Sequence, residues 1–299
     1  MEATQTNDPT SAFEENRGLL FGVAYRMTGS AADAEDLVQE AWLRWMRVEH
    51  AEVRSPADYL VTTVTRLGMD HLRSARVRRE EYVGPWLPEP LMGHDPADGA
   101  DARAELAESL QTAFLVVLET LSPTERAAFL LREVFGHDYV YLAAALDRSE
   151  ANCRQIVRRA RQRVTEGRAR FAALPRELGE VTRRFVEACE GGDMEALMKL
   201  LAPDATFTGD GGGIVPNARR VVLGADNVAR LLVALNAKRE PGMSWRLVPV
   251  NGQPGLVYWL GDEPYGAITL AVAGGRVMDV YVVNNPAKLA GLRASARGA

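Results

Sequence analysis

Residues 139 to 164 read YVYLAAALDRSEANCRQIVRRARQRV, and this stretch decides how the helical part of the chain is organised. Its apolar residues recur at helical spacing in two runs, which are interrupted at Asp147 and Arg148. Ser149 is a typical N-cap residue, and Glu150 suits the first turn of a helix. The pattern predicts a helix, a short turn and a second helix. Asp147 stands where such turns commonly have glycine, and it can adopt the left-handed backbone conformation at modest cost.

The second of these helices is basic. Residues 147 to 176 contain nine arginines and three acids, a local balance of plus six in a chain of net charge −5. A basic segment in an acidic protein indicates a polyanionic partner. A helix-turn-helix inserts the N-terminal end of its second helix into the major groove of DNA. The stretch therefore predicts a DNA-binding helix-turn-helix, and the alternative is that the arginines only form a solvated face.

Length and composition fit a protein of several domains. The 299 residues suffice for two or three domains, and 47% apolar and 25% charged residues are ordinary for a soluble protein. The chain has neither a run long enough for a membrane span nor an N-terminal signal, so we expect a cytoplasmic protein without a membrane partner. Cys153 and Cys189 cannot form a zinc site alone, and we predict neither a metal nor a cofactor.

Two parts of the chain differ in pattern. Helical periodicity dominates before residue 174, interrupted by a segment rich in proline and glycine at 82–101 that favours an extended linker. The predicted helices here are 13–27, 31–48, 55–79, 106–121, 124–135 and the two of the helix-turn-helix. After Pro175 we predict helices at 178–189, 194–201 and 225–238, and strands at 205–210, 219–224, 244–252, 254–262, 266–275 and 276–286. Helices followed by a curved antiparallel sheet indicate an α+β domain.

Several blocks resemble a known family. The segments AEDLVQEAWLRWMR (34–47), DYLVTTVTRLGMDHLR (58–73) and LSPTERAAFLLR (121–132), followed by the helix-turn-helix, resemble an extracytoplasmic-function (ECF) sigma factor over roughly residues 10 to 170. The segment 187–213 resembles the cone-shaped SnoaL-like fold. YVGPWLPEP at 82–90, DGGG at 210–213 and NPAKL at 285–289 resemble motifs of the SigJ-like subgroup, which carries such a C-terminal extension.

The resemblance implies a multidomain chain with two all-α sigma domains and an α+β SnoaL-like cone. The expected domains are sigma region 2 at 10–80, a proline-rich linker at 81–103, sigma region 4 at 104–172 and a SnoaL-like regulatory domain at 177–299. The implied partners are the clamp and flap regions of the RNA polymerase core and promoter DNA. The residues implied in binding the core are Asp36, Leu37, Gln39, Glu40, Trp42, Leu43 and Arg44, with burial in the protein core as the alternative for Leu37 and Trp42.

Three further groups of residues follow from the resemblance. Residues implied in minus-10 binding are Arg66, Asp70, Arg73, Arg76 and Arg78, and those implied in minus-35 reading are Ser149, Glu150, Asn152, Cys153, Arg154, Arg158 and Arg161. Residues implied in contacts between the linker and the cone are Tyr82, Trp86, Leu87, Pro88, Asp210, Gly211, Gly212, Gly213, Asn285, Pro286, Lys288 and Leu289. Apolar side chains in a proline-stiffened linker favour docking on the cone.

The two cone motifs depart from the subgroup pattern. Ile214 stands where the pattern has lysine, and Ala287 replaces the usual acidic residue. Both departures remove a charge, which puts a salt bridge between the two motifs in doubt. Residues 177 to 299 contain 13 acids and 13 basic residues, so we do not expect this domain to bind DNA electrostatically.

The predicted function is that of a promoter-specificity subunit, modulated in cis by its C-terminal domain and not an enzyme. The alternative is a bifunctional or ligand-gated protein whose cone binds a small molecule or acts as a cyclase or isomerase. Cyclases of that family use a histidine with an aspartate, whereas all four histidines here precede residue 138. Asp210, Asp226, Asp262 or Asp279 could serve as a lone catalytic base, but a surface or turn role is the stronger interpretation for each.

Overall fold

The computed structural model describes residues 8–80, 82–92, 110–168, 173 and 175–292. Of these, 8–77 and 121–161 form one compact unit, and 78–92, 110–120 and 162–292 form a second one. No helix in these ranges has an apolar stretch long enough to cross a bilayer.

The first half of the helical unit consists of three helices, α1 (Pro9–Thr28), α2 (Ala31–Trp45) and α3 (Pro56–Glu80), with the short turn η1 (His50–Glu52) before α3. α1 begins four residues earlier than the periodicity predicts, because the Asp8 side chain caps its first turn. α2 starts where the sequence predicts, since the Ser30 hydroxyl accepts a hydrogen bond from the Asp33 amide. Leu20, Leu60 and Trp45 lie in the shared core and are almost fully buried.

The second half contains α6 (Pro123–Phe129), the π-helical turn η2 (Leu130–Val134), α7 (Tyr139–Leu146) and α8 (Glu150–Arg168). Ser122 and Glu125 form a reciprocal capping box at the start of α6. Between α7 and α8 the backbone of Asp147 is left-handed, with φ 53°. The predicted helix-turn-helix is confirmed, including its unusual aspartate turn.

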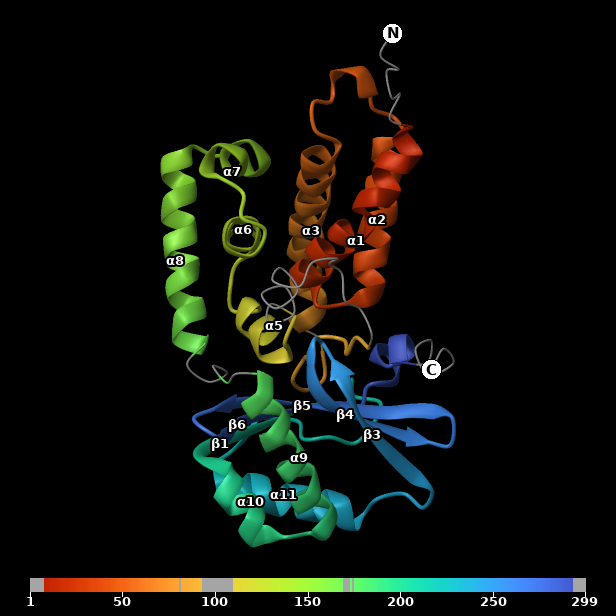
Figure 1. Ribbon diagram of the computed structural model, residues 1–299, viewed down its shortest axis with the longest axis vertical. Coiled ribbons are helices and arrows are strands. Elements are labelled where there is room, and N and C mark those ends of the chain that lie inside the picture. Colours follow the sequence, from red (N-terminus) through yellow and green to blue (C-terminus); the bar gives the residue numbers. More distant parts are fainter. Residues whose placement is uncertain (1–7, 81, 93–109, 169–172, 174, 293–299) are drawn as a thin grey trace. The chain divides into compact units, whose positions relative to one another are not determined.

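The second unit is built on a six-stranded sheet with the order β2-β1-β6-β5-β4-β3. Its strands are β1 (Leu201–Asp210), β2 (Val222–Leu223), β3 (Met243–Val250), β4 (Gln253–Leu260), β5 (Glu263–Ala273) and β6 (Arg276–Val283). α9 (Pro175–Gly191), α10 (Met194–Leu200) and α11 (Ala225–Ala237) cover one face of it (Figure 1). The buried core between helices and sheet includes Phe185, Phe207 and Leu270.

The sequence predicts a wholly antiparallel sheet, and this prediction is wrong for one pair of strands. β1 and β6 run parallel, while every other neighbouring pair is antiparallel. The hairpins from β3 to β6 fix their own antiparallel order, but β1 and β6 are distant in the chain and no tight turn dictates their direction. β1 also begins four residues before the predicted strand, with an irregular register between Leu201 and Thr206.

Elements from before the cone also belong to this unit. α5 (Thr112–Leu118) packs against β5, and Val117 lies against Gly167 near the end of α8. A Cβ at Gly167 would stand 2.6 Å from the Val117 side chain, so this contact requires a glycine.

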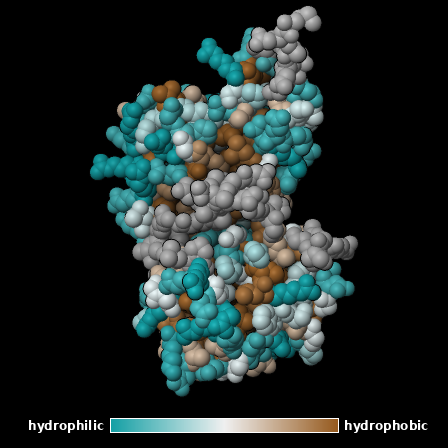
Figure 2. All heavy atoms as spheres, in the orientation of Figure 1, coloured by the Kyte–Doolittle hydropathy of each residue, from teal (hydrophilic) through white to brown (hydrophobic). Residues whose placement is uncertain are grey.

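The visible surface is mostly hydrophilic, with apolar residues gathered over β3 and β4 (Figure 2), where Leu247 and Leu260 are exposed.

Candidate functional site

Asp210, the last residue of β1, is the centre of a polar cluster beneath the proline-rich linker. Its side chain has no exposed area. Its backbone oxygen accepts hydrogen bonds from the amides of Asn284 and Asn285, at 2.9 and 3.0 Å, which joins the end of β1 to the segment after β6. A buried carboxylate is costly unless charged or hydrogen-bonding groups compensate it, so its partners identify what the site holds together.

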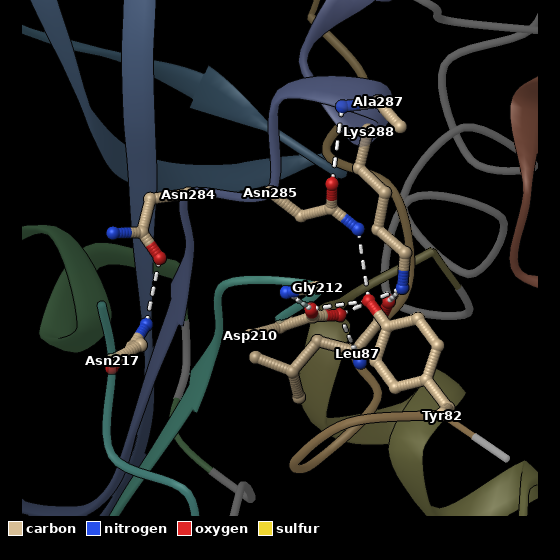
Figure 3. Close-up of polar contacts among 9 residues, drawn as sticks. All are labelled: Tyr82, Leu87, Asp210, Gly212, Asn217, Asn284, Asn285, Ala287 and Lys288. Atoms are coloured by element: carbon tan, nitrogen blue, oxygen red, sulfur yellow. Dashed lines mark hydrogen bonds and ion pairs between the residues drawn. The ribbon is translucent and has the colours of Figure 1, made fainter. Parts of the chain in front are cut away.

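Four donors surround the Asp210 carboxylate (Figure 3). Oδ1 accepts from the Tyr82 hydroxyl at 2.5 Å and from the Gly212 amide at 3.1 Å. Oδ2 accepts from the Leu87 amide at 2.9 Å and from the Lys288 ammonium at 2.7 Å. Two of these donors belong to the linker and two to the cone, so this one carboxylate ties the segments together.

Lys288 supplies the compensating charge. It lies in η3 (Pro286–Lys288), and its side chain is only 8% exposed. Besides Asp210, its ammonium donates to the Leu87 carbonyl at 2.5 Å. The rings of Trp86 and Tyr82 face the ammonium, with centroids at 4.1 and 5.2 Å. Cation–π contacts and an anion thus stabilise this buried charge from the linker side and the cone side together.

Tyr82 is held from a second direction. Its hydroxyl accepts a hydrogen bond from Asn285 Nδ2 at 2.9 Å, while Asn285 Oδ1 accepts from the Ala287 amide. Burial, followed by the hydrogen bond to Asp210, raises the pKa of the Tyr82 hydroxyl well above its ordinary value. The hydroxyl therefore keeps its proton and acts as a donor to Asp210.

The glycines after Asp210 are required by this geometry. Gly212 has φ +61°, and a Cβ there would stand 2.4 Å from the Asn285 side chain. At Gly211 a Cβ would stand 2.2 Å from the Val215 carbonyl oxygen. A side chain at Gly212 would therefore push the loop away from Asn285, and one at Gly211 would push it away from Val215.

A second anchor holds the linker four residues further on. The Leu91 backbone amide donates to Asn251 Oδ1 at 2.7 Å, and the Asn251 backbone amide donates to the Leu91 carbonyl at 2.8 Å. Met92 forms an antiparallel bridge with Val250. Asn251 is not among the residues predicted from the sequence. Its only signal is an asparagine before glycine, and that pattern fits any hairpin turn, here with φ 52°.

We call Tyr82, Leu87, Asp210, Asn285 and Lys288 the clasp. The predicted docking of the linker on the cone is confirmed by these contacts. Of the other residues predicted here, Pro88 and Leu289 are buried, Trp86 covers Lys288, Gly213 lies beside Val83, and Pro286 is exposed at the start of η3.

The doubt about a salt bridge between the two motifs is wrong, because Asp210 and Lys288 pair at 2.7 Å. The two departures from the subgroup pattern do not affect this pair. Ile214 is 66% exposed and Ala287 is also exposed, so neither position faces the buried charges.

The predicted DNA-reading residues divide into exposed and buried ones. Asn152, Arg154 and Arg158 are exposed on α8, and Ser149 Oγ accepts from the Asn152 amide as an N-cap does. Glu150 pairs with Arg154 at 2.6 Å, and Arg161 pairs with Glu133 at 2.7 Å.

Cys153 does not belong among the DNA-reading residues. It is fully buried, because it shares the inner face of α8 with Ile156, Val157 and Ala160. The interpretation of Cys153 as a DNA contact is therefore corrected.

Residues predicted to track DNA phosphates lie along α3. The Arg66 guanidinium donates to the carbonyls of Ala144 and Ala145, at 2.7 and 2.8 Å, near the C-terminal end of α7. Asp70 and Arg73 form an exposed pair at 2.7 Å. Arg76 and Arg78 lie on α3, and their side chains are outside the described part of the structure.

The predicted core-binding residues lie on α2. Asp36, Gln39, Leu43 and Arg44 are exposed, and Glu40 pairs with Arg44 at 3.0 Å. Trp42 is half-buried with its ring against Phe13. Leu37 is 8% exposed and packs in the protein core with Val38 and Ala41, so its interpretation as a docking residue is corrected.

The remaining aspartates considered as a base have other surroundings. Asp226 pairs with Arg230 at 2.9 Å, and Asp279 Oδ1 accepts from the Thr206 hydroxyl at 2.6 Å. Asp262 lies in the exposed turn between β4 and β5. Within the described ranges, no group of three or more His, Cys, Asp or Glu residues could hold a metal ion.

Three family models match the chain. Sigma-70 region 2 matches residues 12–78, Sigma-70 region 4 matches 111–164, and a SnoaL-like domain matches 182–289. The matches follow the order in which α1 to α3, the helix-turn-helix and the cone occur in the chain.

Curated relatives and a solved structure agree with these models. The chain is 40% identical to the ECF RNA polymerase sigma factor SigJ of Mycobacterium tuberculosis, over 94% of this chain and 93% of that protein. It is 33% identical to the probable ECF RNA polymerase sigma factor SigI of the same organism, over 98% and 99%. The crystal structure of M. tuberculosis SigJ superposes with a TM-score of 0.74 at 36% identity, covering 94% of this chain and 98% of that one.

Proposed function

Because this chain belongs to the extracytoplasmic-function (ECF) family of RNA polymerase sigma factors, we propose that the clasp restrains its promoter-binding domains in cis. The helical domains would bind the polymerase core and promoter DNA, and the SnoaL-like domain would hold the linker that joins them. Working with the polymerase core, the protein would act in the cytoplasm.

The exposed faces of two helices support the binding roles. On α8, Asn152 and Arg154 are exposed near the N-terminal end, where a recognition helix meets base edges. On α2, Leu43 is 45% exposed among charged neighbours, and an exposed apolar residue of this kind suits a protein partner. We propose Asp36, Gln39, Leu43 and Arg44 as the part of the predicted set that meets the core.

The buried carboxylate of Asp210 is the observation that carries the regulatory proposal. It accepts from the Leu87 amide and the Tyr82 hydroxyl of the linker while pairing with Lys288 of the cone. If the linker left, Asp210 and Lys288 would lose three hydrogen bonds to it. The clasp therefore stabilises the bound linker by more than an exposed ion pair could.

The contacts of Arg66 indicate that the clasp restrains promoter binding rather than activating it. The Arg66 guanidinium donates hydrogen bonds to two carbonyls of α7, and these contacts compete with a DNA phosphate for the same donors. Promoter binding would require α3 and α7 to separate. With residues 82–92 fixed on the cone, less of the chain between α3 and α5 is free to allow that movement. We infer that the clasp opens when the chain engages polymerase.

Transcription by purified core polymerase tests this function. A library of genomic fragments serves as template, and sequencing of the products shows which transcripts depend on the added chain. Asp210→Asn should raise the yield of these transcripts about tenfold or more, because a larger fraction of the chain is unrestrained. Asp262→Asn, in an exposed turn, is the matched control and should leave the yield unchanged.

A milder variant keeps the test valid if Asp210→Asn misfolds the cone. Tyr82→Phe keeps both charges of the Asp210–Lys288 pair and removes only the two hydrogen bonds of the Tyr82 hydroxyl, to Asp210 and from Asn285, so it should raise the yield by a smaller factor. If both variants fold and neither raises the yield, the restraint is wrong. If neither the wild-type chain nor the folded Asp210→Asn variant yields a transcript of its own with core polymerase, the sigma function itself is wrong.

We also propose that the cone is not an enzyme. The sequence has no histidine after His137, and Asp210 is committed to the clasp. Burial raises the pKa of the Cys189 thiol to about 12, so this residue would be a poor nucleophile at neutral pH. These surroundings disfavour the cyclase or isomerase alternative. The ligand-gated alternative depends on the cavity of the cone.

A further inference from the structure

The cone contains a cavity that no part of the clasp fills. Its volume is about 210 Å³, and it lies between α9, α11 and the sheet. Aromatic and aliphatic side chains form most of its wall, among them Phe185, Phe207, Trp245 and Ile268. A cavity of about 150 Å³ with such a lining is enough to bind benzene, so this one has room for a ligand of one or two rings.

The charges that line the cavity cancel. Lys238 and Arg239 contribute two positive charges, and Glu190 and Glu240 contribute two negative ones. Glu190 also accepts a hydrogen bond from the Trp245 indole. With two charges of each sign, the lining has no net preference for an anion or a cation, which favours an uncharged ligand.

Two hydrogen-bond donors lie at the sheet side of this cavity. Among the described residues, none hydrogen-bonds the Tyr258 hydroxyl. Burial raises its pKa, with smaller contributions from Cys189 and Glu190, so the hydroxyl stays protonated. The second donor is Asn284. Its Oδ1 accepts from Asn217 at 2.7 Å, which fixes the amide so that Nδ2 is the free end.

Gly266 separates these two donors and leaves space between them. It pairs with Tyr258 across β4 and β5, and a Cβ on it would stand 3.3 Å from the Asn284 Cβ. All three residues line the cavity. Because Gly266 has no side chain, a ligand group can lie against the sheet with one donor on each side.

From this geometry we propose that the cone binds a small uncharged ligand of one or two rings, whose carbonyl or other acceptor group lies over Gly266 between Tyr258 and Asn284. An acceptor satisfies both donors, whereas a purely apolar ligand would leave them unpaired. The ring system occupies the aromatic part of the cavity.

The same residues connect the cavity to the clasp. Asn284 lines the cavity, while its neighbour Asn285 binds Tyr82, and the two side chains leave the backbone on opposite sides (Figure 3). Pro216 also lines the cavity, next to Asn217, in the loop that follows Asp210. A ligand that accepts a hydrogen bond from Asn284 therefore contacts both segments that hold the linker, the loop after Asp210 and the segment after β6. This regulatory consequence, unlike the binding site, rests on the proposed function of the clasp.

Three related probes test the site in the full-length chain by isothermal titration calorimetry. They are 2-acetylnaphthalene, which has a carbonyl acceptor, naphthalene, which has none, and 2-naphthoate, which is charged. We expect saturable binding of one 2-acetylnaphthalene per chain, with naphthalene and 2-naphthoate each bound about tenfold or more weakly. Absence of saturable 2-acetylnaphthalene binding, or equal affinity for the three, would overturn the proposal.

Two variants locate the bound probe. Tyr258→Phe should weaken 2-acetylnaphthalene about tenfold and change naphthalene by less than twofold, because only the first probe uses the hydroxyl. Tyr281→Phe, in the same sheet but outside the cavity lining, is the matched control and should change neither. Gly266→Val fills the gap between the donors and should abolish binding of 2-acetylnaphthalene, with thermal unfolding as the check on its fold.

The outcomes separate the site from the clasp. Binding of 2-acetylnaphthalene to Gly266→Val as to the wild type, or an equal loss of both probes in Tyr258→Phe, would contradict the site whatever the clasp does. If the probe binds as expected while Asp210→Asn leaves transcription unchanged, the ligand site stands and the proposed restraint fails.

Discussion

Replacing Lys288 by methionine should release the linker from the cone while keeping most of the side chain's packing. Lys288 is 8% exposed and its partner Asp210 is fully buried, so solvent screens their attraction little. Removing one partner of a buried ion pair typically costs 3 to 5 kcal/mol, because the other charge stays buried without compensation. Asp210 keeps three other donors, so we take the lower end, about 3 kcal/mol.

Hydrogen exchange of the Leu87 amide reports this loss directly. That amide donates to Asp210 Oδ2, and it can exchange only when the bond opens. A cost of about 3 kcal/mol corresponds to an opening equilibrium roughly 150-fold more favourable, at 1.36 kcal/mol per tenfold change. The exchange rate of Leu87 in Lys288→Met should rise by about that factor.

Two comparisons make the result specific. Lys199 forms an exposed pair with Glu195 one helical turn away, so Lys199→Met should leave the Leu87 rate unchanged. Adding Asp210→Asn to Lys288→Met removes the uncompensated charge, so the double variant should cost less than the sum of the two single changes. An unchanged Leu87 rate in Lys288→Met, or strict additivity in the double variant, would show that the buried ion pair does not hold the linker.

Three further predictions concern other parts of the chain. Gly212→Ala should lower the free energy of unfolding of the cone by about 2 to 3 kcal/mol, whereas Gly192→Ala, at the same φ of +61° but in open space, should cost about 1 kcal/mol, as thermal unfolding would measure. Arg154→Ala should alter the preferred minus-35 sequence while Arg76→Ala weakens binding to all sequences alike, and equal effects of both on every sequence in a binding-site selection would contradict these roles. Alkylation of Cys189 in the native chain at pH 8 should be about a thousandfold slower than in the unfolded chain, because burial raises the pKa of its thiol from 9.0 to about 12, and similar rates would show that the thiol is accessible.

Local signals in the sequence predict most of the elements. Ser30, Ser122 and the glycine-containing turns mark helix and strand ends by short-range hydrogen bonds and backbone preferences, and these need no tertiary context. The same holds for the turn at Asp147. The parallel pairing of β1 and β6 has no such signal, because it joins strands about 70 residues apart in the chain.

The parts of the candidate site that lie in sequence motifs could be predicted, whereas the parts that depend on isolated side chains could not. The linker, the DGGG loop and the NPAKL segment are recognisable by sequence, and the structure brings them together. The anchor at Asn251 and the donors Tyr258 and Asn284 are isolated residues. Their importance comes only from what lies opposite them in the folded sheet.

Burial explains the two corrections among predicted contacts. Leu37 and Cys153 lie within segments that resemble functional helices, but both occupy the inward face of their helix. A motif identifies the helix that meets a partner, whereas the orientation of each side chain depends on the packing of neighbouring helices.

The central claim is that the clasp holds the linker in the free chain and opens when the chain binds polymerase. The most direct test is the exchange rate of the Leu87 amide in the full-length protein, with and without saturating RNA polymerase core. We expect strong protection of the Leu87 amide in the free chain and much faster exchange in the complex. Equal or greater protection of Leu87 in the complex would show that the clasp stays closed on the polymerase, which contradicts the proposed opening.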